Sequence, residues 1–361
     1  ALKIQIRVHY TWFAWFWQDF CRLLYFAVYL NYNVYRPFGE RYRCGRAAGM
    51  DSCRLRTGEK ICGEMEKSMD IFKELCSITG EKNVLVGEPM SRHTTFRIGG
   101  PADYFVTPES AEHIRGLTEL CRGNDVPYYI VGNGSNLLVG DKGYRGVIIQ
   151  VYKNMNKIET DGERVRAQAG ALLSRIAASA LEASLTGLEF ASGIPGTLGG
   201  ALRMNAGAYG GEMKQVVECA TVLTPPGEVL EIPVSDLGMS YRTSVIAKND
   251  YVVLEAVLRL KKGNKEEIRA LMDDLKVRRV TKQPLEYGSA GSTFKRPEGY
   301  FAGKLIQDSG LRGFRVGQAQ VSEKHCGFVI NRGGATAAQV TELMEQVRAR
   351  VKERFGVELE P

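Results

Sequence analysis

The segment from Gly187 to Gly210 constrains the fold of this chain more than any other stretch. Seven of its 24 residues are glycine, and its centre, residues 193–200, reads GIPGTLGG. Glycine and proline at this density predict an ordered loop rather than a regular helix or strand. The segment is also apolar, unlike a flexible linker, and long loops of this kind commonly have a binding role. We therefore expect its bare backbone to lie against a flat ligand.

A second glycine-rich segment, residues 131–138 (VGNGSNLL), follows an apolar run that predicts a strand at residues 128–131. A turn of this composition can direct consecutive backbone N–H groups at a phosphate, and its glycines permit close approach. It differs from the G-x-G-x-x-G dinucleotide fingerprint, because a second strand at residues 137–139 is predicted to follow rather than a helix. An ordinary hairpin turn is the alternative interpretation.

Composition and charge exclude several classes of protein. The 361 residues, 44% of them hydrophobic, are enough for two or three packed units of a soluble globular protein. The formal net charge is +7, but residues 1–68 contribute +5 and residues 69–361 only +2. This nearly neutral body lacks the basic character of a nucleic-acid-binding protein.

Cysteine usage indicates free thiols. The eight cysteines show no C-x-x-C spacing, and only four histidines accompany them. The pattern predicts no metal site, and it is typical of the reducing cytoplasm rather than of a disulfide-rich secreted protein.

Residues 1–64 differ in composition from the rest of the chain. The residues up to Tyr42 hold 14 of the 33 aromatic side chains and all three tryptophans. An apolar run over residues 10–32 is interrupted by Asp19 and Arg22, and charges at the centre of a membrane span are costly. No signal-peptide cleavage pattern follows. We interpret these residues as an atypical aromatic and basic extension, disordered or artefactual, on which no function rests.

From residue 69 onward the hydrophobic pattern becomes regular and predicts two domains. The first covers residues 69–262 and the second covers residues 263–361. Within the first domain, Thr107 is predicted to cap a helix whose first position is the following proline.

The end of the chain carries clear local signals. Thr336 and Gln339 form a T-x-x-Q capping box, and Gly356 is a suitable C-terminal cap for the same helix. The alternation of residues 357–360 then predicts the start of a strand. Because this strand has no end before Pro361, we expect the natural protein to continue.

Six motifs follow one another in order: TFRIGGPAD, VGNGSNLL, GIPGTLGGA, MNAGAYGGE, SYRTS and GSTFKRP. Together they resemble the UDP-N-acetylenolpyruvoylglucosamine reductase (MurB) family of bacterial flavoenzymes over about residues 69–361. The short segment between Arg242 and Ser292 resembles the compact type II form of that family. The resemblance implies an α+β fold. An FAD-binding domain of the vanillyl-alcohol-oxidase (PCMH) type would have two subdomains, of about residues 69–150 and 151–262, and a smaller α+β domain would bind substrate.

The resemblance also implies an activity. It is the reduction of UDP-N-acetyl-3-O-(1-carboxyvinyl)-glucosamine to UDP-N-acetylmuramate, with non-covalent FAD, NADPH as reductant, hydride delivery to C3 and protonation at C2. The implied partners are the UDP-sugar and NADPH, without nucleic acid and without membrane contact for residues 69–361. A cytoplasmic role in peptidoglycan synthesis, and so in cell shape and division, follows from that reaction.

Candidate cofactor residues come from the first motif and the two glycine-rich segments. By resemblance, residues 132–136 would hold the FAD pyrophosphate and residues 193–200 would lie along the isoalloxazine. The cofactor residues so implied are Arg97, Gly99, Gly132, Asn133, Gly134, Ser135, Asn136, Gly193, Ile194, Gly196, Thr197 and Gly200. Neither His93 nor His325 sits in a motif for covalent flavin attachment.

Two catalytic residues are implied by the same resemblance. Reduction of an enol ether builds negative charge on the carbon conjugated to the carboxylate, so the site needs a fixed cation and a proton donor. Arg242 matches the arginine that polarises the carboxylate, and a guanidinium stays charged and can bind both oxygens. Ser292 matches the proton-donating serine. The ordinary alternatives are a surface arginine and a turn or cap serine.

Basic groups are expected to bind the substrate diphosphate. The substrate-binding candidates are Tyr241, Lys282, Lys295 and Arg296, of which the cations are otherwise ordinary solvated side chains.

The family's third catalytic residue is a glutamate directly after the tripeptide L-E-P, which here ends the chain at Pro361. Neither Glu358 nor Glu360 matches its place, and we therefore expect this truncated chain to lack it. Two alternatives stay open. One is a flavin-binding but inactive form, and the other is a carbohydrate oxidase on the same flavin fold.

Overall fold

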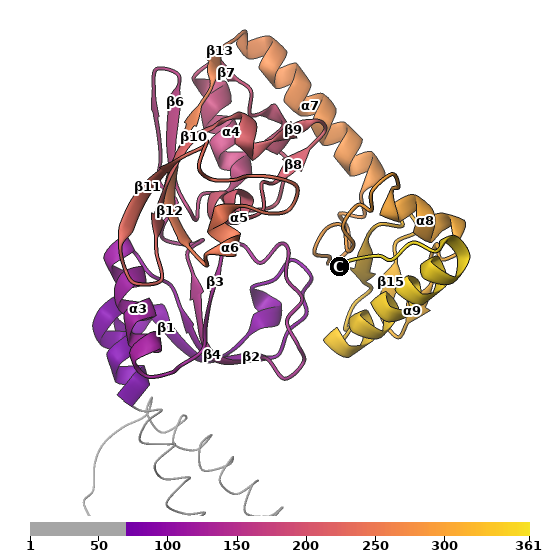
Figure 1. Cartoon of the computed structure of the whole chain (residues 1–361), viewed down its shortest axis with the longest axis horizontal. Coiled ribbons are helices and arrows are strands. Elements are labelled where there is room, and N and C mark those ends of the chain that lie inside the picture. Colours follow the sequence, from indigo (N-terminus) through magenta and orange to yellow (C-terminus); the bar gives the residue numbers. More distant parts are fainter. Residues whose placement is uncertain (1–69) are drawn as a thin grey trace, which may run out of the picture. The chain divides into compact units, whose positions relative to one another are not determined.

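The computed structural model describes residues 70–361, and the aromatic and basic extension lies outside the described residues. The described chain begins with a helix at residues 70–79. Two large sheets with their helices follow, together with two strand pairs, β7 (Leu185–Thr186) with β13 (Lys261–Lys262) and β8 (Gly207–Ala208) with β9 (Gly211–Glu212). A smaller helix-and-sheet domain forms the C-terminal end (Figure 1).

The first sheet has four strands. In spatial order these are β1 (Val84–Pro89), β2 (Pro101–Val106), β4 (Tyr144–Gln150) and β3 (Tyr128–Val131). β1 pairs antiparallel with β2, whereas β4 pairs parallel with both β2 and β3. The helix at residues 70–79 and helix α3 (Ala111–Gly123) pack together with this sheet, burying Leu75 and Leu117 completely.

The parallel pairing of β3 and β4 overturns two expectations. Residues 137–139 form no strand, and residues 132–143 are turn and irregular loop. The hairpin alternative is wrong as well, because two parallel strands cannot be joined by a hairpin turn. The glycine turn at residues 132–136 instead leaves the carboxyl end of β3, the edge at which α/β sheets commonly bind ligands.

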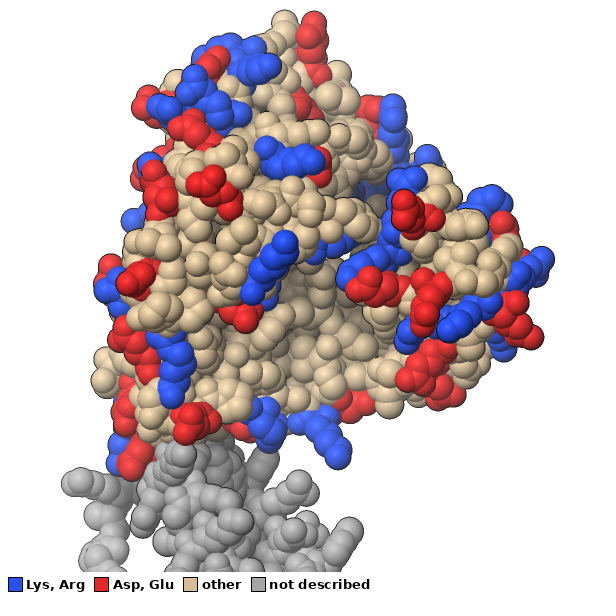
Figure 2. Space-filling model, viewed as in Figure 1, with Lys and Arg blue, Asp and Glu red and all other residues tan. Residues whose placement is uncertain are grey.

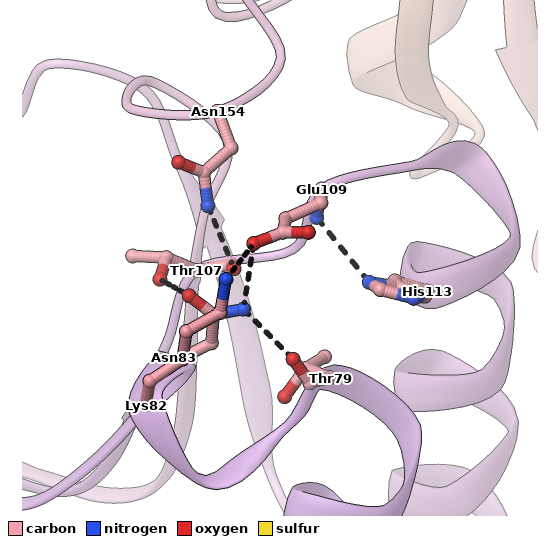
Figure 3. Close-up of polar contacts among 7 residues, drawn as sticks. All are labelled: Thr79, Lys82, Asn83, Thr107, Glu109, His113 and Asn154. Atoms are coloured by element: carbon pink, nitrogen blue, oxygen red, sulfur yellow. Dashed lines mark hydrogen bonds and ion pairs between the residues drawn. The ribbon is translucent and has the colours of Figure 1, made fainter.

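The start of α3 also differs from the prediction. Ser110, not Thr107, is the N-cap, and its hydroxyl accepts a hydrogen bond from the backbone N–H of His113 (3.2 Å). The Thr107 hydroxyl donates instead to Oδ1 of Asn83 (3.3 Å), whose amide donates to the Glu109 carboxylate (3.1 Å; Figure 3). A tertiary partner therefore takes the side chain that local pattern assigned to the cap.

The second sheet is antiparallel throughout. Its strands, in spatial order, are β11 (Val229–Pro233), β10 (Val217–Leu223), β12 (Val252–Arg259), β6 (Arg164–Gln168) and β5 (Ile158–Asp161). Helices α4 (Leu173–Glu182) and α5 (Leu198–Arg203) contribute to the large apolar core beside it. This core is the largest of the described part of the chain and supports the long glycine-rich segment.

That segment contains more regular structure than predicted. Residues 193–197 form the expected loop, but α5 begins at Leu198, so Gly199 and Gly200 are helical. Leu198 and Leu202 are completely buried, which outweighs the low helix propensity of two glycines. A Cβ at Gly199 would lie 3.1 Å from the Cβ of Ala169, so glycine lets the helix pack closely.

The C-terminal domain follows α7 (Lys265–Lys282), which runs to it from the second sheet (Figure 1). Its elements are α8 (Ala302–Asp308), β14 (Arg315–Val316), β15 (Ala319–Val321), β16 (Val329–Asn331) and α9 (Ala337–Phe355). The capping box of Thr336 and Gln339 is confirmed, and Gly356 adopts φ 67° at the end of α9. Both signals act within a few residues, which is why the sequence reveals them.

The predicted terminal strand is wrong. Residues 357–361 have no regular secondary structure. Leu359 is completely buried, its carbonyl accepts a hydrogen bond from Nε of Arg348 (3.0 Å), and the Glu360 carbonyl accepts from the N–H of Lys295 (2.7 Å). The alternating pattern therefore reflects one buried leucine and single hydrogen bonds to a helix and a loop, not a sheet ladder.

The described residues have mixed surface charge, and they contain no candidate metal cluster. Lys and Arg side chains are interspersed with Asp and Glu over the face in view (Figure 2). No helix among residues 70–361 is long and apolar enough to cross a membrane, and no three potential metal ligands cluster there. Cys121 is a free thiol, and burial raises its pKa to about 11.

The loop between β3 and β4 tests the role of close backbone contact. Gly143 has φ +79°, and a Cβ on it would lie 1.8 Å from the carbonyl oxygen of Pro101. Gly143→Ala should therefore lower the free energy of unfolding by about 2–4 kcal/mol in urea titrations, because strain and overlap add. Gly162→Ala is the matched control, since φ is +58° but nothing lies within 4 Å; it should cost about 1 kcal/mol. Equal losses would contradict this explanation.

Candidate active site

Three glycine-bearing motifs meet beside the carboxyl end of β3. The N–H of Thr95 donates to the carbonyl of Gly134 (3.2 Å), and the Asn133 amide donates to the carbonyl of Pro195 (2.9 Å). A Cβ at Gly132 would lie 2.1 Å from Oγ1 of Thr197. The TFRIGG motif, the 132–136 turn and the 193–197 loop therefore form one continuous surface.

The 132–136 turn has the character of an anion site. Among the described residues, none of its five backbone N–H groups donates to a protein acceptor. Gly134 has φ +62°, and a Cβ on it would lie 2.0 Å from the carbonyl oxygen of His93, so only glycine fits there. Unpaired N–H groups on a glycine turn are suited to a phosphate. These residues fit the diphosphate of a dinucleotide cofactor such as FAD.

The structure gives Gly99 a packing role. It has φ +141°, and a Cβ on it would lie 2.9 Å from the Cβ atoms of both Met90 and Val139. The loop that follows the 132–136 turn can therefore approach β1 and β2 closely. Arg97, with φ 57°, is exposed, and its carbonyl accepts a hydrogen bond from the Asn331 amide (3.4 Å).

A cation from helix α7 lies against the 193–197 loop, and the sequence motifs do not identify it. Arg279, from α7, lies against it, and a Cβ at Gly193 would be 2.8 Å from its Nε. That Nε is buried and has no hydrogen-bond partner in the described structure. Burial lowers the pKa of Arg279, and a hydrogen bond with Tyr209 opposes the shift. Arg279 sits in a charge-rich helical stretch, where no local signal distinguishes it from solvated neighbours.

A cavity of about 290 Å³ brings the catalytic candidates together. Asn136 and Leu138 come to it from the loop after β3, and α9 contributes apolar side chains. The side chains from α9 are Val340 and Met344, and the lining also includes Arg242, Ser292, Lys295 and Pro361. Residues far apart in the sequence therefore enclose one cavity, in which a cation, a hydroxyl group and a bound substrate can meet.

Arg242 is held in the cavity wall by a tight turn. Ser240 and Thr243 exchange two backbone hydrogen bonds (3.1 and 3.2 Å), and Arg242 between them has φ 58°. Positive φ in a non-glycine residue costs about 1 kcal/mol or more and tends to occur at functional sites. Its guanidinium is exposed, with Nη1 3.4 Å from the sulfur of Met204.

Ser292 is exposed on a segment fixed by its neighbours. It forms an isolated β-bridge with Phe328. The adjacent Thr293 donates its N–H to the carbonyl of Gly327 (2.9 Å), and its hydroxyl accepts from the N–H of Val329 (3.0 Å). The backbone of Ser292 is therefore held in place, while its hydroxyl has no hydrogen-bond partner among residues 70–361 and can bind a ligand.

Of the substrate-binding candidates, Lys295 alone lines the cavity, where it forms an ion pair with Glu360. Tyr241 and Arg296 are outside the lining, and the Tyr241 hydroxyl accepts a hydrogen bond from the N–H of Arg296 (2.9 Å). Lys282 is outside the cavity lining, at the end of α7. Burial, with a smaller contribution from Lys282, lowers the pKa of His325.

The carboxylates of Glu358 and Glu360 form ion pairs with basic side chains. Glu358 lies 3.6 Å from both Arg348 and Lys352, and Glu360 pairs with Lys295. Pro361, in contrast, lines the cavity that contains Arg242.

A second cavity of about 240 Å³ adjoins the 132–136 turn through Asn133. Its lining includes Gln150, which is only 3% exposed and whose Oε1 has no hydrogen-bond partner within the described chain. His93 also lines it, stacks on Phe105 with ring centroids 4.0 Å apart, and contacts Glu88 through Nε2 (2.9 Å). A buried, unsatisfied acceptor next to an anion site fits a further part of a nucleotide cofactor.

Comparisons with known proteins agree with this geometry. Residues 102–233 match the family described as "FAD binding domain", and residues 283–361 match "UDP-N-acetylenolpyruvoylglucosamine reductase, C-terminal domain". The chain is similar to the UDP-N-acetylenolpyruvoylglucosamine reductase of Clostridium novyi, with 53% identity over 295 residues, 82% of this chain and 96% of the relative. The corresponding protein of Clostridioides difficile is 50% identical over 293 residues, 81% of this chain and 96% of that relative.

The chain is also similar to a solved structure. The crystal structure of UDP-N-acetylenolpyruvylglucosamine reductase (MurB) from Thermus caldophilus is 36% identical, with a TM-score of 0.66, and the match covers 76% of this chain and 96% of that one. The expected fold, an FAD-binding domain together with a smaller α+β domain, is confirmed, and FAD is the cofactor that the first domain implies.

The contact between Gly132 and Thr197 predicts a defect in cofactor retention. Gly132→Ala should yield protein that loses most of its FAD on gel filtration, because the new Cβ would separate the turn from the 193–197 loop. Gly140→Ala is the control, since Gly140 lies outside both segments and a Cβ on it would meet nothing within 4 Å. The measurement is the ratio of flavin to protein absorbance. Normal retention in Gly132→Ala would refute the role of this close contact.

Proposed function

The chain belongs to the UDP-N-acetylenolpyruvoylglucosamine reductase family, and on that basis we propose that it reduces UDP-N-acetyl-3-O-(1-carboxyvinyl)-glucosamine to UDP-N-acetylmuramate with NADPH. The observation that carries the proposal is the cavity that joins Arg242, Ser292 and Asn136. It combines a fixed cation and a free hydroxyl with the end of the turn that suits a cofactor diphosphate.

The same proposal assigns a separate binding role to each domain. Residues 69–262 bind FAD and residues 263–361 bind substrate. FAD, when bound, transfers hydride from NADPH to C3 of the enolpyruvyl group. The backbone N–H groups of residues 132–136 would hold its diphosphate and the 193–197 loop would lie along its ring system, without covalent attachment. The reaction belongs to cytoplasmic peptidoglycan synthesis, and therefore to cell growth and division.

Arg242 binds the substrate carboxylate. Hydride addition at C3 places negative charge on C2 and, by conjugation, on the carboxylate oxygens. A guanidinium can bind both oxygens and stabilises that charge more strongly as it develops. The strained turn between Ser240 and Thr243 fixes the position of this cation before substrate arrives, so little reorganisation is needed during the reaction.

Ser292 donates the proton to C2. An alcohol is a weak acid, so its proton must be transferred as negative charge forms next to it. The hydroxyl is exposed to the cavity while the backbone is held by the 327–329 segment, which keeps the donor in one place. Lys295 lies on the same cavity wall, where its ammonium group pairs with Glu360.

Lys282, Arg296 and Tyr241 complete the substrate site in this proposal. The Arg296 guanidinium stacks on Phe301, 3.9 Å from the ring centroid, which holds it extended. A diphosphate carries charge that two cations and a phenol can bind through charge-assisted hydrogen bonds.

Anaerobic absorbance spectroscopy of purified protein tests the function. Flavin bands that bleach with NADPH and return when the enolpyruvyl UDP-sugar is added would support the reductase. Bleaching without return would support the inactive, flavin-binding alternative. Reoxidation by oxygen with a simple carbohydrate donor, but no response to NADPH, would support the oxidase alternative. Protein without flavin bands would contradict the cofactor assignment.

Variants of the two catalytic residues should separate the half-reactions. In Arg242→Lys and Ser292→Ala, flavin reduction by NADPH should stay within about twofold of wild type, while reoxidation by the enolpyruvyl UDP-sugar should slow by about 10²–10³-fold. Arg145→Lys is the control, because Arg145 pairs with Asp103 outside the cavity (2.8 Å). Stopped-flow absorbance measures both rates. Equal slowing of both half-reactions would argue against these roles.

A further inference from the structure

Asp141 makes an unusual contact with the C-terminal domain. Its two carboxylate oxygens accept hydrogen bonds from the backbone N–H groups of Ala337 (2.7 Å) and Ala338 (3.0 Å), the first two residues of α9. The helix already has a cap of its own, because Oγ1 of Thr336 accepts from the N–H of Gln339 (3.2 Å). A second cap therefore comes from a residue 196 positions earlier in the chain.

The backbone of Asp141 is fixed to the first domain. The N–H of Gly100 donates to the carbonyl of Gly140 (3.0 Å), and a Cβ at Gly100 would lie 2.1 Å from the carbonyl oxygen of Asp141. The next close approach is that of Gly143 to Pro101. The TFRIGG motif thus holds the loop on both sides of Asp141, so this carboxylate is presented from a rigid base.

Both partners of this contact also form the candidate active cavity. The loop that leads to Asp141 contributes Asn136 and Leu138 to the lining, and α9 contributes Val340 and Met344. Val340 lies one turn after the helix start that Asp141 binds. A negative charge at a helix N-terminus is favourable, and two charge-assisted hydrogen bonds restrict its direction.

We propose that Asp141 is a positioning residue, which holds α9 and the C-terminal domain at a fixed place against the cofactor-binding loop. Its contact sets the separation of the two cavity walls, and so the affinity for the sugar nucleotide. The second part of this statement rests on the proposed function, whereas the first part concerns the protein alone.

Hydrogen–deuterium exchange of the holoenzyme tests the first part. The reporter is the N–H of Ser289, which donates to the carbonyl of Thr95 (3.1 Å) and so crosses between the domains at another place. Asp141→Asn keeps the size of the side chain but presents an amide group to a helix N–H, and should speed exchange at Ser289 about fivefold or more.

Thr336→Val is the matched control for this experiment. It is nearly isosteric and removes a cap from the same helix end, at a comparable cost in helix stability. It leaves the contact of Asp141 intact, so exchange should increase within the first turn of α9 but not at Ser289. Unchanged exchange at Ser289 in Asp141→Asn, or an equal increase in both variants, would overturn the positioning role.

Binding of UDP-N-acetylmuramate to the oxidised holoenzyme, measured by flavin absorbance, tests the second part. Asp141→Asn should bind it about fivefold more weakly, and Thr336→Val should stay within twofold of wild type. Equal affinity in wild type and Asp141→Asn would overturn the link to substrate. Wild-type protein that does not bind the nucleotide would count against the proposed function, while the exchange result would still decide the role of Asp141.

Discussion

Direct contact between backbone segments, without an intervening Cβ, is the constraint on which the rest of this structure depends. At Gly134 the backbone of His93, and at Gly132 the side chain of Thr197, lies where a Cβ would be, and the hydrogen bonds of Thr95 and Asn133 join the same segments. Three loops distant in sequence can therefore share one surface. Side chains at the glycine positions would push them apart and would occupy the space that the cofactor needs.

The two domains contribute different halves of the chemistry. The first supplies unpaired backbone N–H groups and the strained turn that carries Arg242, whereas the second supplies Ser292 on a segment braced by its own small sheet. Neither half forms the cavity alone. The contacts between domains, at Thr95 and at Asp141, are therefore as much part of the site as the reacting groups.

The sequence predicts this molecule well where a signal is local or repeated. The capping box at Thr336 needs only neighbouring residues, and the repeated glycine motifs meet in one surface. Thr107 is the opposite case, because Asn83 competes for its hydroxyl and the cap moves to Ser110. Helix α5 arises in a glycine-rich stretch because burial of Leu198 outweighs propensity.

Long-range partners explain what the sequence does not reveal. Arg279 lies against the 193–197 loop, and Gln150 lines the cavity beside the 132–136 turn. No sequence spacing connects either residue to the motifs. The short terminal segment at residues 357–361 alternates like a strand, yet alternation alone creates no partner strand.

Helix α7 has a mechanical consequence. It is anchored near its start, where Lys265 pairs with Glu182 (2.7 Å), and Arg279 rests on Gly193 close to its far end. An α-helix is stiff over this length, so α7 joins these two contacts to the C-terminal domain as one rigid element. A displacement of the C-terminal domain would therefore also change the contact between Arg279 and the loop at Gly193.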